Sequence, residues 1–195
     1  MRRSILDAAK QLFVKEGFDN VSMRRIAAAI EYSPAAIYRY FKNKREILSV
    51  LREEGFQRFV GEQRQRILDI SEPLERLKVG GRGYLQFAIN DPDSFHLMFC
   101  TDCEEVDLEG QLAESSLASF CLFKQNVSEC LDAGHFGNAD LETVVFSLWS
   151  GLQGLAHLIK TGRVEILGEG IDIDALIDKI LAFNLRSNGK KDDSA

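Results

Sequence analysis

Apolar residues recur at helical spacing along most of the chain, and no segment shows the strict alternation that predicts a β-strand. In the first 50 residues the pattern predicts a helix that ends at Gly17 and two shorter helices over Met23–Ile30 and Pro34–Phe41. Ser22 precedes the second helix and Ser33-Pro34 opens the third. These are typical start signals, because a hydroxyl caps free N–H groups and Pro fits the first helical position. The third helix is too short to be a major core element. Its outer face consists of small residues and tyrosines.

The rest of the chain predicts six longer or buried helices. One begins at Asn43 or Lys44 and continues to about Ile70, and the others cover Pro73–Asn90, Pro92–Cys100, Leu112–Leu131, Leu141–Ile159 and Asp172–Leu185. The apolar positions of Leu141–Ile159 step alternately by four and three residues, which is the seam of a helix in a bundle. We expect an all-α protein of about nine helices, with a head at residues 1–43 and a body at residues 44–195. Residues 101–110 are acidic and predicted to be irregular, and residues 187–195 are a polar tail.

The charge is divided unevenly between the two ends of the chain. The net charge is −6, yet residues 1–50 contain ten Lys and Arg against five Asp and Glu, and residues 51–195 contain 14 against 25. A basic head on an acidic body is typical of a protein whose one end meets a polyanion. Small side chains and phenol hydroxyls on a short helix, flanked by several Arg and Lys, suit insertion between two rows of phosphates. The head therefore predicts a helix-turn-helix that binds the major groove of DNA.

The order of these residues resembles the TetR family of bacterial transcriptional regulators. The resemblance is carried by Ile5, Ala8, Ala9, Leu12, Phe13, Gly17 and Phe18, then Ser22, Ile26 and Ala27, then Ser33, Tyr38, Tyr40, Phe41, Lys44, Ile47 and Leu48. It covers about the first quarter of the chain. The later segment Trp149-Ser150-Gly151-Leu152-Gln153-Gly154 is similar to a subgroup that has a Trp-x-Gly-x-x-Gly helix. Membership implies an all-α homodimer, a palindromic operator and an effector pocket in the body, which would then be the effector-binding and dimerisation domain.

One position departs from the family pattern. The family usually has Gly in the turn where this chain has Glu31, and an aliphatic residue where it has Tyr32. A left-handed Glu costs roughly 1 kcal/mol more than Gly. The departure leaves the fold prediction unchanged and makes the base preference harder to predict.

The predicted DNA contacts lie in the second and third helices and at the start of the fourth. They are Ser22, Arg24, Arg25, Ser33, Pro34, Ala35, Ala36, Tyr38, Arg39, Tyr40 and Lys44. The resemblance places Tyr38 and Lys44 on phosphates, although Tyr38 could instead be a half-buried packing residue and Tyr40 could cover the small domain. Arg24 is the candidate for a bidentate guanine contact, with a phosphate contact as the alternative. The tip Pro34-Ala35-Ala36 offers only apolar contacts, so we expect modest direct readout and a larger contribution from DNA shape.

The body supplies candidates for an effector pocket and for the dimer interface. Aromatic and polar side chains that could line a mostly apolar pocket are Phe87, Phe95, Phe99, Phe120, Phe123, Trp149, Gln153 and His157, although most aromatics at helical spacing are core and His157 could be an interface residue. The predicted interface residues lie on the last two helices and are Leu141, Val145, Leu148, Leu152, Leu155, Ile159, Ile173, Leu176, Ile177 and Ile180. Gly151 and Gly154 would allow the two backbones to approach closely.

Several other kinds of site are disfavoured. Cys100-x-x-Cys103 supplies only one pair of metal ligands, whereas a structural zinc site normally needs two pairs. The acidic residues beside Cys103 argue against a reactive thiol, so we expect reduced structural thiols. We expect no cofactor, no metal and no enzymatic activity, because no phosphate loop, nucleophile elbow or histidine cluster is present. The uncharged stretch Thr143–Ile159 contains two Gly, two Ser, Gln and His, so a buried interface helix is expected rather than a membrane span. With no signal peptide recognised, a cytoplasmic protein is expected.

The sequence therefore predicts a ligand-responsive transcriptional regulator, with repression as the action that the family resemblance favours. Its expected partners are double-stranded DNA, a small apolar effector and a second copy of the chain, and no membrane. The alternative is a helical protein that binds DNA nonspecifically, or binds only a ligand, without operator specificity.

Overall fold

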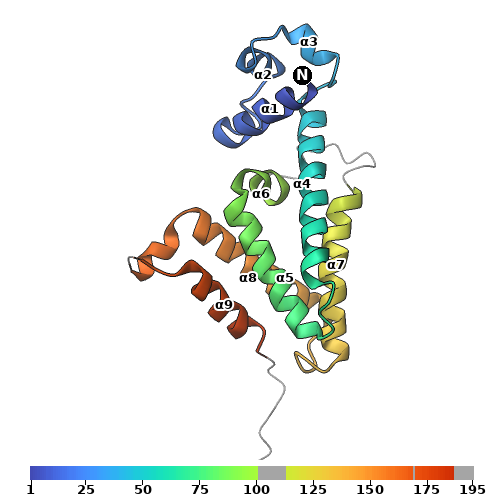
Figure 1. Cartoon of the computed structure of the whole chain (residues 1–195), viewed down its shortest axis with the longest axis vertical. Coiled ribbons are helices and arrows are strands. Elements are labelled where there is room, and N and C mark those ends of the chain that lie inside the picture. Colours follow the sequence, from blue (N-terminus) through green and yellow to red (C-terminus); the bar gives the residue numbers. More distant parts are fainter. Residues whose placement is uncertain (101–112, 169, 187–195) are drawn as a thin grey trace, which may run out of the picture. The chain divides into compact units, whose positions relative to one another are not determined.

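The computed structural model describes residues 1–100, 113–168 and 170–186. These residues form nine α-helices and one 3-10 helix over Arg163–Leu167 (Figure 1). The α-helices are α1 Arg2–Glu16, α2 Met23–Ala29, α3 Pro34–Tyr38, α4 Lys44–Ile67, α5 Pro73–Asn90, α6 Pro92–Phe99, α7 Ala113–Asp132, α8 Leu141–Lys160 and α9 Ile173–Asn184. The all-α prediction and its helix order are confirmed. The predicted irregular segment 101–110 and the tail 187–195 lie outside the described residues.

Most differences from the predicted elements lie at helix ends. The helix α3 ends at Tyr38 rather than Phe41, because the chain continues as a turn in which the N–H of Tyr40 donates to the carbonyl of Ile37. The helix α4 ends at Ile67, three residues earlier than predicted. The 3-10 helix between α8 and α9 was not predicted, since its five residues are too few to show a period.

The chain divides into two compact units. One unit comprises Met1–Phe59 and Asp91–Leu117, and the other comprises Val60–Asn90 and Ala118–Ala195. The division differs from the predicted boundary at residue 43, because the first part of α4 and all of α6 belong with the head. The predicted domains, residues 1–43 for DNA binding and residues 44–195 for effector binding and dimerisation, remain a proposal.

The first unit is built on a core that α1, α2, α3, α4 and α6 share. Ile5 and Phe13 of α1, Ile26 of α2, Ile37 of α3 and Leu48 of α4 are all essentially inaccessible to solvent. In Figure 1 the helices α1, α2 and α3 form a cluster close to the N-terminus. A buried aliphatic or aromatic side chain contributes about 1.5–3 kcal/mol, so this core fixes the three short helices that isolated peptides of their length could not maintain.

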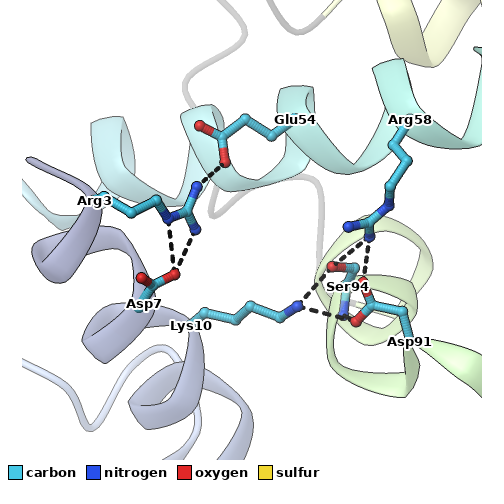
Figure 2. A network of polar contacts seen from close by, with 7 residues as sticks. All are labelled: Arg3, Asp7, Lys10, Glu54, Arg58, Asp91 and Ser94. Carbon is cyan, nitrogen blue, oxygen red and sulfur yellow. Dashed lines mark hydrogen bonds and ion pairs between the residues drawn. The ribbon is translucent and has the colours of Figure 1, made fainter.

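Charged side chains add a second set of contacts within the first unit, as Figure 2 shows. Arg3 of α1 pairs with Asp7 one turn later and with Glu54 of α4, each at 2.7 Å. On the same side Lys10 of α1 donates to Asp91 at 3.0 Å and to Ser94 Oγ at 2.8 Å. These contacts attach α1 to α4 and to the start of α6 at two separate points.

Asp91 is the centre of the second group of contacts. Its carboxylate accepts from Lys10, from Arg58 of α4 and from the backbone N–H of Ser94, which makes it the N-cap of α6 (Figure 2). Partial burial opposes ionisation, but the hydrogen bonds from Lys10 and Ser94 outweigh it and lower the pKa of Asp91 to about 2. The start of α6 is therefore held by an ionised carboxylate at all ordinary pH values.

The second unit is centred on α5, which packs against α8 and α9. A Cβ atom at Gly81 of α5 would lie only 2.9 Å from Cδ2 of Leu181 of α9, so a larger residue there would make the Leu181 side chain shift. Val127, Cys130, Val145 and Leu77 form a core beside it. None of the described helices is both long enough and apolar enough to cross a membrane.

Candidate nucleic-acid interface

The helices α2 and α3 pack against each other and are joined by a tight turn, as a helix-turn-helix requires. The N–H groups of Glu31 and Tyr32 donate to the carbonyls of Ala28 and Ala27, at 3.3 and 3.0 Å, which closes the end of α2. Glu31 has φ 59°, so this residue adopts the left-handed conformation that the departure from glycine implied. The turn is intact despite a cost of about 1–2 kcal/mol for a residue with a side chain.

The helix α3 buries one side chain and presents the rest. Ile37 is fully buried against the core, whereas Tyr38 is 55% exposed and Tyr40 is 42% exposed. Ala35 and Arg39 are also exposed, and Pro34 and Ala36 are partly exposed. Both phenols therefore point away from the core, as contact with a ligand outside the unit requires.

Ser22 and Ser33 cap the two helices of the motif. Ser22 Oγ accepts from the N–H of Arg25 at 3.1 Å, and Ser33 Oγ accepts from the N–H of Ala36 at 3.3 Å. A hydroxyl that accepts in this way still has its own proton to donate. Both serines are exposed, so each can donate to a phosphate oxygen at the positive end of a helix.

The two arginines at the start of α2 have different surroundings. Arg25 forms an ion pair with Glu16 of α1, with 2.7 Å between Nη2 and Oε1. Arg24 is exposed, and no ion pair holds it within the described residues. Arg25 thus also connects α2 to α1, and the contacts of Arg24 and Arg25 with DNA both remain predictions.

Lys44 is partly exposed, and its side chain extends to the loop between α1 and α2. Its ammonium group donates to the backbone carbonyls of Phe18 at 2.7 Å and Asp19 at 3.1 Å, and lies 4.3 Å from the centre of the Phe18 ring. Two of its three N–H donors thus bind the loop between α1 and α2, which ends at Ser22. The phosphate contact expected of Lys44 remains a prediction.

One supporting feature of the interface was missed in the sequence. The carboxylate of Glu46 accepts from the backbone N–H of Lys42 at 2.5 Å, and Asn43 Oδ1 accepts from the N–H of Glu46 at 2.8 Å. This arrangement resembles a capping box, and the signal Asn43-x-x-Glu46 was available in the sequence. It fixes the start of α4 directly after the exposed phenols.

The predicted effector residues do not form one group. Phe95 and Phe99 lie in the first unit, where they pack with each other and Phe99 packs with Phe56 and Phe59. Phe87, Phe120, Phe123, Trp149, Gln153 and His157 lie in the second unit. Within it Phe120 packs on Trp149 and Gln153 accepts a hydrogen bond from Tyr84, while Phe87 is buried and His157 is exposed. His157 on an exposed face does not line an interior pocket.

A hollow does occur within the second unit. It is a small hollow that opens to solvent, with about 290 Å³ of space between atoms when open solvent is included, and it is lined by Leu77, Gly81, Phe123, Leu148, Leu152, Leu181, Asn184 and Leu185. Of the predicted pocket residues only Phe123 borders it. Leu148 and Leu152, predicted at the dimer interface, line it as well.

The predicted dimer residues fall into two sets. Val145, Leu155 and Ile177 are buried in the core of the second unit, and their place at a dimer interface remains a prediction. The remaining seven are partly exposed and are Leu141, Leu148, Leu152, Ile159, Ile173, Leu176 and Ile180. The large apolar side chains that these helices expose most are ones the sequence analysis did not select, namely Phe146, Leu158 and Phe183.

The cysteines carry no ligand cluster in the part of the chain that the structure describes. No group of three His, Cys, Asp or Glu there could hold a metal ion. Burial, and secondarily the charge of Glu72, raises the pKa of the Cys130 thiol to about 11, which makes it an unreactive core residue at neutral pH. Cys103 lies outside the described residues.

A helix-turn-helix with exposed phenols, capped helix starts and an exposed arginine defines a DNA-binding protein. Two family models match the chain: "Bacterial regulatory proteins, tetR family" over residues 5–51 and "Tetracyclin repressor-like, C-terminal domain" over residues 77–183. The chain belongs to the TetR family of bacterial transcriptional regulators, which are not enzymes. These matches do not resolve the subgroup with the Trp-x-Gly-x-x-Gly helix, which remains a prediction.

Individual relatives agree with this assignment. An HTH-type transcriptional regulator from Staphylococcus aureus is 30% identical over 95 residues, which are 49% of this chain and 51% of the relative. An uncharacterised HTH-type regulator from Mycobacterium tuberculosis is 33% identical over 88 residues, 45% of this chain and 44% of the relative. The chain thus spans about half the length of the curated relatives it matches.

Solved structures share the fold over nearly the whole chain. The TetR family regulator PfmR from Thermus thermophilus has a TM-score of 0.75 at 18% identity, with 95% of this chain and 99% of that chain covered. AibR in complex with isovaleryl coenzyme A and operator DNA has a TM-score of 0.75 at 21% identity, with 95% and 98% covered. At these identities the likeness concerns the fold alone.

Proposed function

We propose that this protein is a transcriptional repressor that binds a palindromic operator as a homodimer and releases it when a small, largely apolar effector binds. The observation that carries the proposal is the outward face of the helix-turn-helix, where the phenols of Tyr38 and Tyr40 and the hydroxyls of Ser22 and Ser33 are all exposed. These groups donate hydrogen bonds, and phosphate oxygens only accept them.

The second copy would contact the exposed apolar side chains of α8 and α9. Phe146, Leu158 and Phe183 are 56%, 42% and 68% exposed, and Leu176 and Ile180 add partly exposed surface. Exposed apolar side chains of this size on two neighbouring helices favour an interface between copies of the chain. A dimer with a two-fold axis through this interface has two DNA-binding heads. Such a dimer binds a DNA site of two-fold symmetry, with half-sites about one helical turn apart.

The effector would bind in the second unit, for which the apolar hollow beside Phe123 provides a starting point. AibR, a neighbour in fold, is described in complex with isovaleryl coenzyme A, so short acyl thioesters belong in a ligand panel. The helix α4 contributes residues to both units and is the element through which ligand binding would change the spacing of the heads.

Selection of duplexes from a random pool tests the operator proposal. The expected result is a motif with two-fold symmetry that the purified protein binds at least about a thousandfold more tightly than random DNA at physiological salt. Equal affinity for selected and random duplexes would instead support the alternative, a protein that binds DNA nonspecifically. Isothermal titration of effector candidates, with and without operator, tests the coupling. An effector that binds without changing operator affinity contradicts it.

A further inference from the structure

The tip of α3 carries no hydrogen-bonding side chain. Pro34, Ala35 and Ala36 are the first three residues of the helix, and two of them remain partly exposed while Ala35 is exposed. In a major groove these side chains contact thymine methyl groups and sense shape, but they meet no donor or acceptor on a base edge. Polar readout at this end of the helix must therefore come from side chains that flank the tip.

Glu31 is such a side chain. It lies in the turn between α2 and α3, two residues before Ser33, the N-cap of α3, and it is exposed. The ion pairs among the described residues do not include it, as they do not include the exposed Asp19, whereas Asp7, Glu16 and Glu54 of the same unit pair with arginines. Its carboxylate is available to a group outside the unit.

Glu31 is unfavourable in two ways, one for the fold and one for DNA binding. Its φ of 59° is a conformation that glycine adopts without strain and glutamate does not. Its negative charge also lies in the basic end of the chain, where it weakens attraction to any phosphate backbone. Strained residues persist mainly where the surrounding structure or a function holds them, and the turn itself would be better served by glycine.

We propose that Glu31 is a specificity-determining residue of the DNA interface. Its carboxylate accepts a hydrogen bond from the exocyclic amino group of one cytosine in each half-site, which is the base-edge donor that acidic side chains recognise in the major groove. On duplexes without this cytosine the same charge faces phosphates and unpaired acceptors, so it disfavours them. The proposal rests on the operator-binding function proposed above.

The test compares the full chain with Glu31→Gln and Glu31→Gly in duplex selection and in titrations of the selected and a random duplex. Both variants are expected to bind random DNA about two- to fivefold more tightly, because one repulsive charge is lost. The ratio of specific to random affinity is expected to fall at least about thirtyfold, because the dimer loses one base contact in each of its two half-sites. Selection with Glu31→Gln should shift one C·G position towards adenine, which amide side chains prefer, and selection with Glu31→Gly should leave that position without preference.

Two controls separate a base contact of Glu31 from effects of net charge and of stability. Asp69→Asn removes the same charge from the exposed loop after α4, in the second unit, and is expected to leave the selected motif and the affinity ratio unchanged. The thermal unfolding of Glu31→Gly should occur at or above the wild-type temperature, since glycine relieves the backbone strain. A motif that neither variant changes overturns the role of Glu31 alone. A wild-type chain that selects no motif overturns the operator proposal and this role together.

Discussion

The ammonium nitrogen of Lys44 lies 2.7 Å from the carbonyl oxygen of Phe18, 26 residues earlier in the chain. Together with the bond to Asp19 and the contact with the Phe18 ring, it ties the start of α4 to the loop that precedes α2. Ser22, which caps α2, follows this loop directly. The position of one candidate phosphate ligand is thus set by a side chain that was itself predicted to bind phosphate.

Lys44→Met distinguishes the two roles of this lysine. A methionine of similar length keeps the contact with Phe18 and loses both hydrogen bonds, so the free energy of unfolding should fall by about 1–3 kcal/mol. If Lys44 acts only on the fold, the slope of log affinity against log salt for DNA remains that of the wild type. A slope reduced by about one would show a direct phosphate contact.

The phenol hydroxyls of Tyr38 at the end of α3 and of Tyr40 in the turn after it can be removed without changing the packing. Tyr38→Phe and Tyr40→Phe should each weaken operator binding by about 1–2 kcal/mol, because a hydrogen bond to a charged phosphate is lost. Thermal unfolding should be unchanged, since both rings are exposed. Tyr84→Phe is the matched control in the second unit. It removes the bond to Gln153 and is expected to lower stability while direct DNA contacts persist. If Tyr38→Phe and Tyr40→Phe lower stability but leave operator affinity unchanged, the hydroxyls do not bind phosphate.

The lowered pKa of Asp91 predicts that the stability of the first unit decreases in acid. Its folded pKa of about 2 lies below the ordinary value of 3.8, so its contribution to stability is complete above about pH 4 and is lost as the pH falls towards 2. Asp91→Asn retains the cap of α6 and removes the charge that pairs with Lys10 and Arg58, and should cost at most about 2 kcal/mol at pH 7.

Urea unfolding between pH 7 and pH 2 measures this effect. The difference between wild type and Asp91→Asn should shrink through the range from pH 4 to pH 2. Asp93→Asn, in the same turn of α6 but outside the contacts in Figure 2, should show no such convergence. A constant difference across this range would mean that the asparagine acts by some route other than the lost charge.

The proposed dimer surface can be tested with single charges. Phe146→Glu and Phe183→Glu place carboxylates on α8 and α9 where the monomer leaves the side chain more than half exposed, so the fold should tolerate them. Sedimentation should then show monomers at concentrations where the wild type is dimeric. Leu68→Glu, at a residue 76% exposed elsewhere in the second unit, is the control and should remain dimeric. Dimers in all three variants would place the interface on another face.

Two glycines of the second unit provide a further matched pair. A Cβ at Gly81 would lie 2.9 Å from Leu181 and 3.5 Å from Leu152, whereas a Cβ at Gly154 meets nothing within 4 Å. Gly81→Ala should therefore destabilise the unit by about 1–3 kcal/mol through overpacking. Gly154→Ala should be neutral or stabilise the monomer by up to about 1 kcal/mol. Weaker dimerisation of Gly154→Ala would show that the partner occupies this open space.

Local signals predicted most of the elements, because each signal acts within a few residues. The serine caps, Pro34 at the first turn and Gly17 after α1 are all where the pattern placed them. The family resemblance placed a turn at Glu31, and the structure gives this residue the left-handed φ of 59°. Helix ends were less certain, as at α3, where two further residues continue as a turn.

The direction of long side chains could not be predicted in this way. Lys44 and Arg25 have the sequence context of surface cations, but their partners are Phe18 and Glu16, which only the tertiary fold brings near. The seam of α8 raised a related difficulty. Its spacing shows that Val145 and Leu155 face another helix, but it cannot show whether that helix belongs to the same copy of the chain.

The engaged cations of the first unit have a consequence for experiments at different ionic strengths. Arg3, Lys10 and Arg25 already neutralise carboxylates within the fold, so the head offers a polyanion fewer charges than its composition suggests. Added salt weakens those internal ion pairs as well as any binding to nucleic acid. A titration with salt thus loosens the scaffold and the complex simultaneously, and unfolding curves recorded at each ionic strength are needed to separate the two.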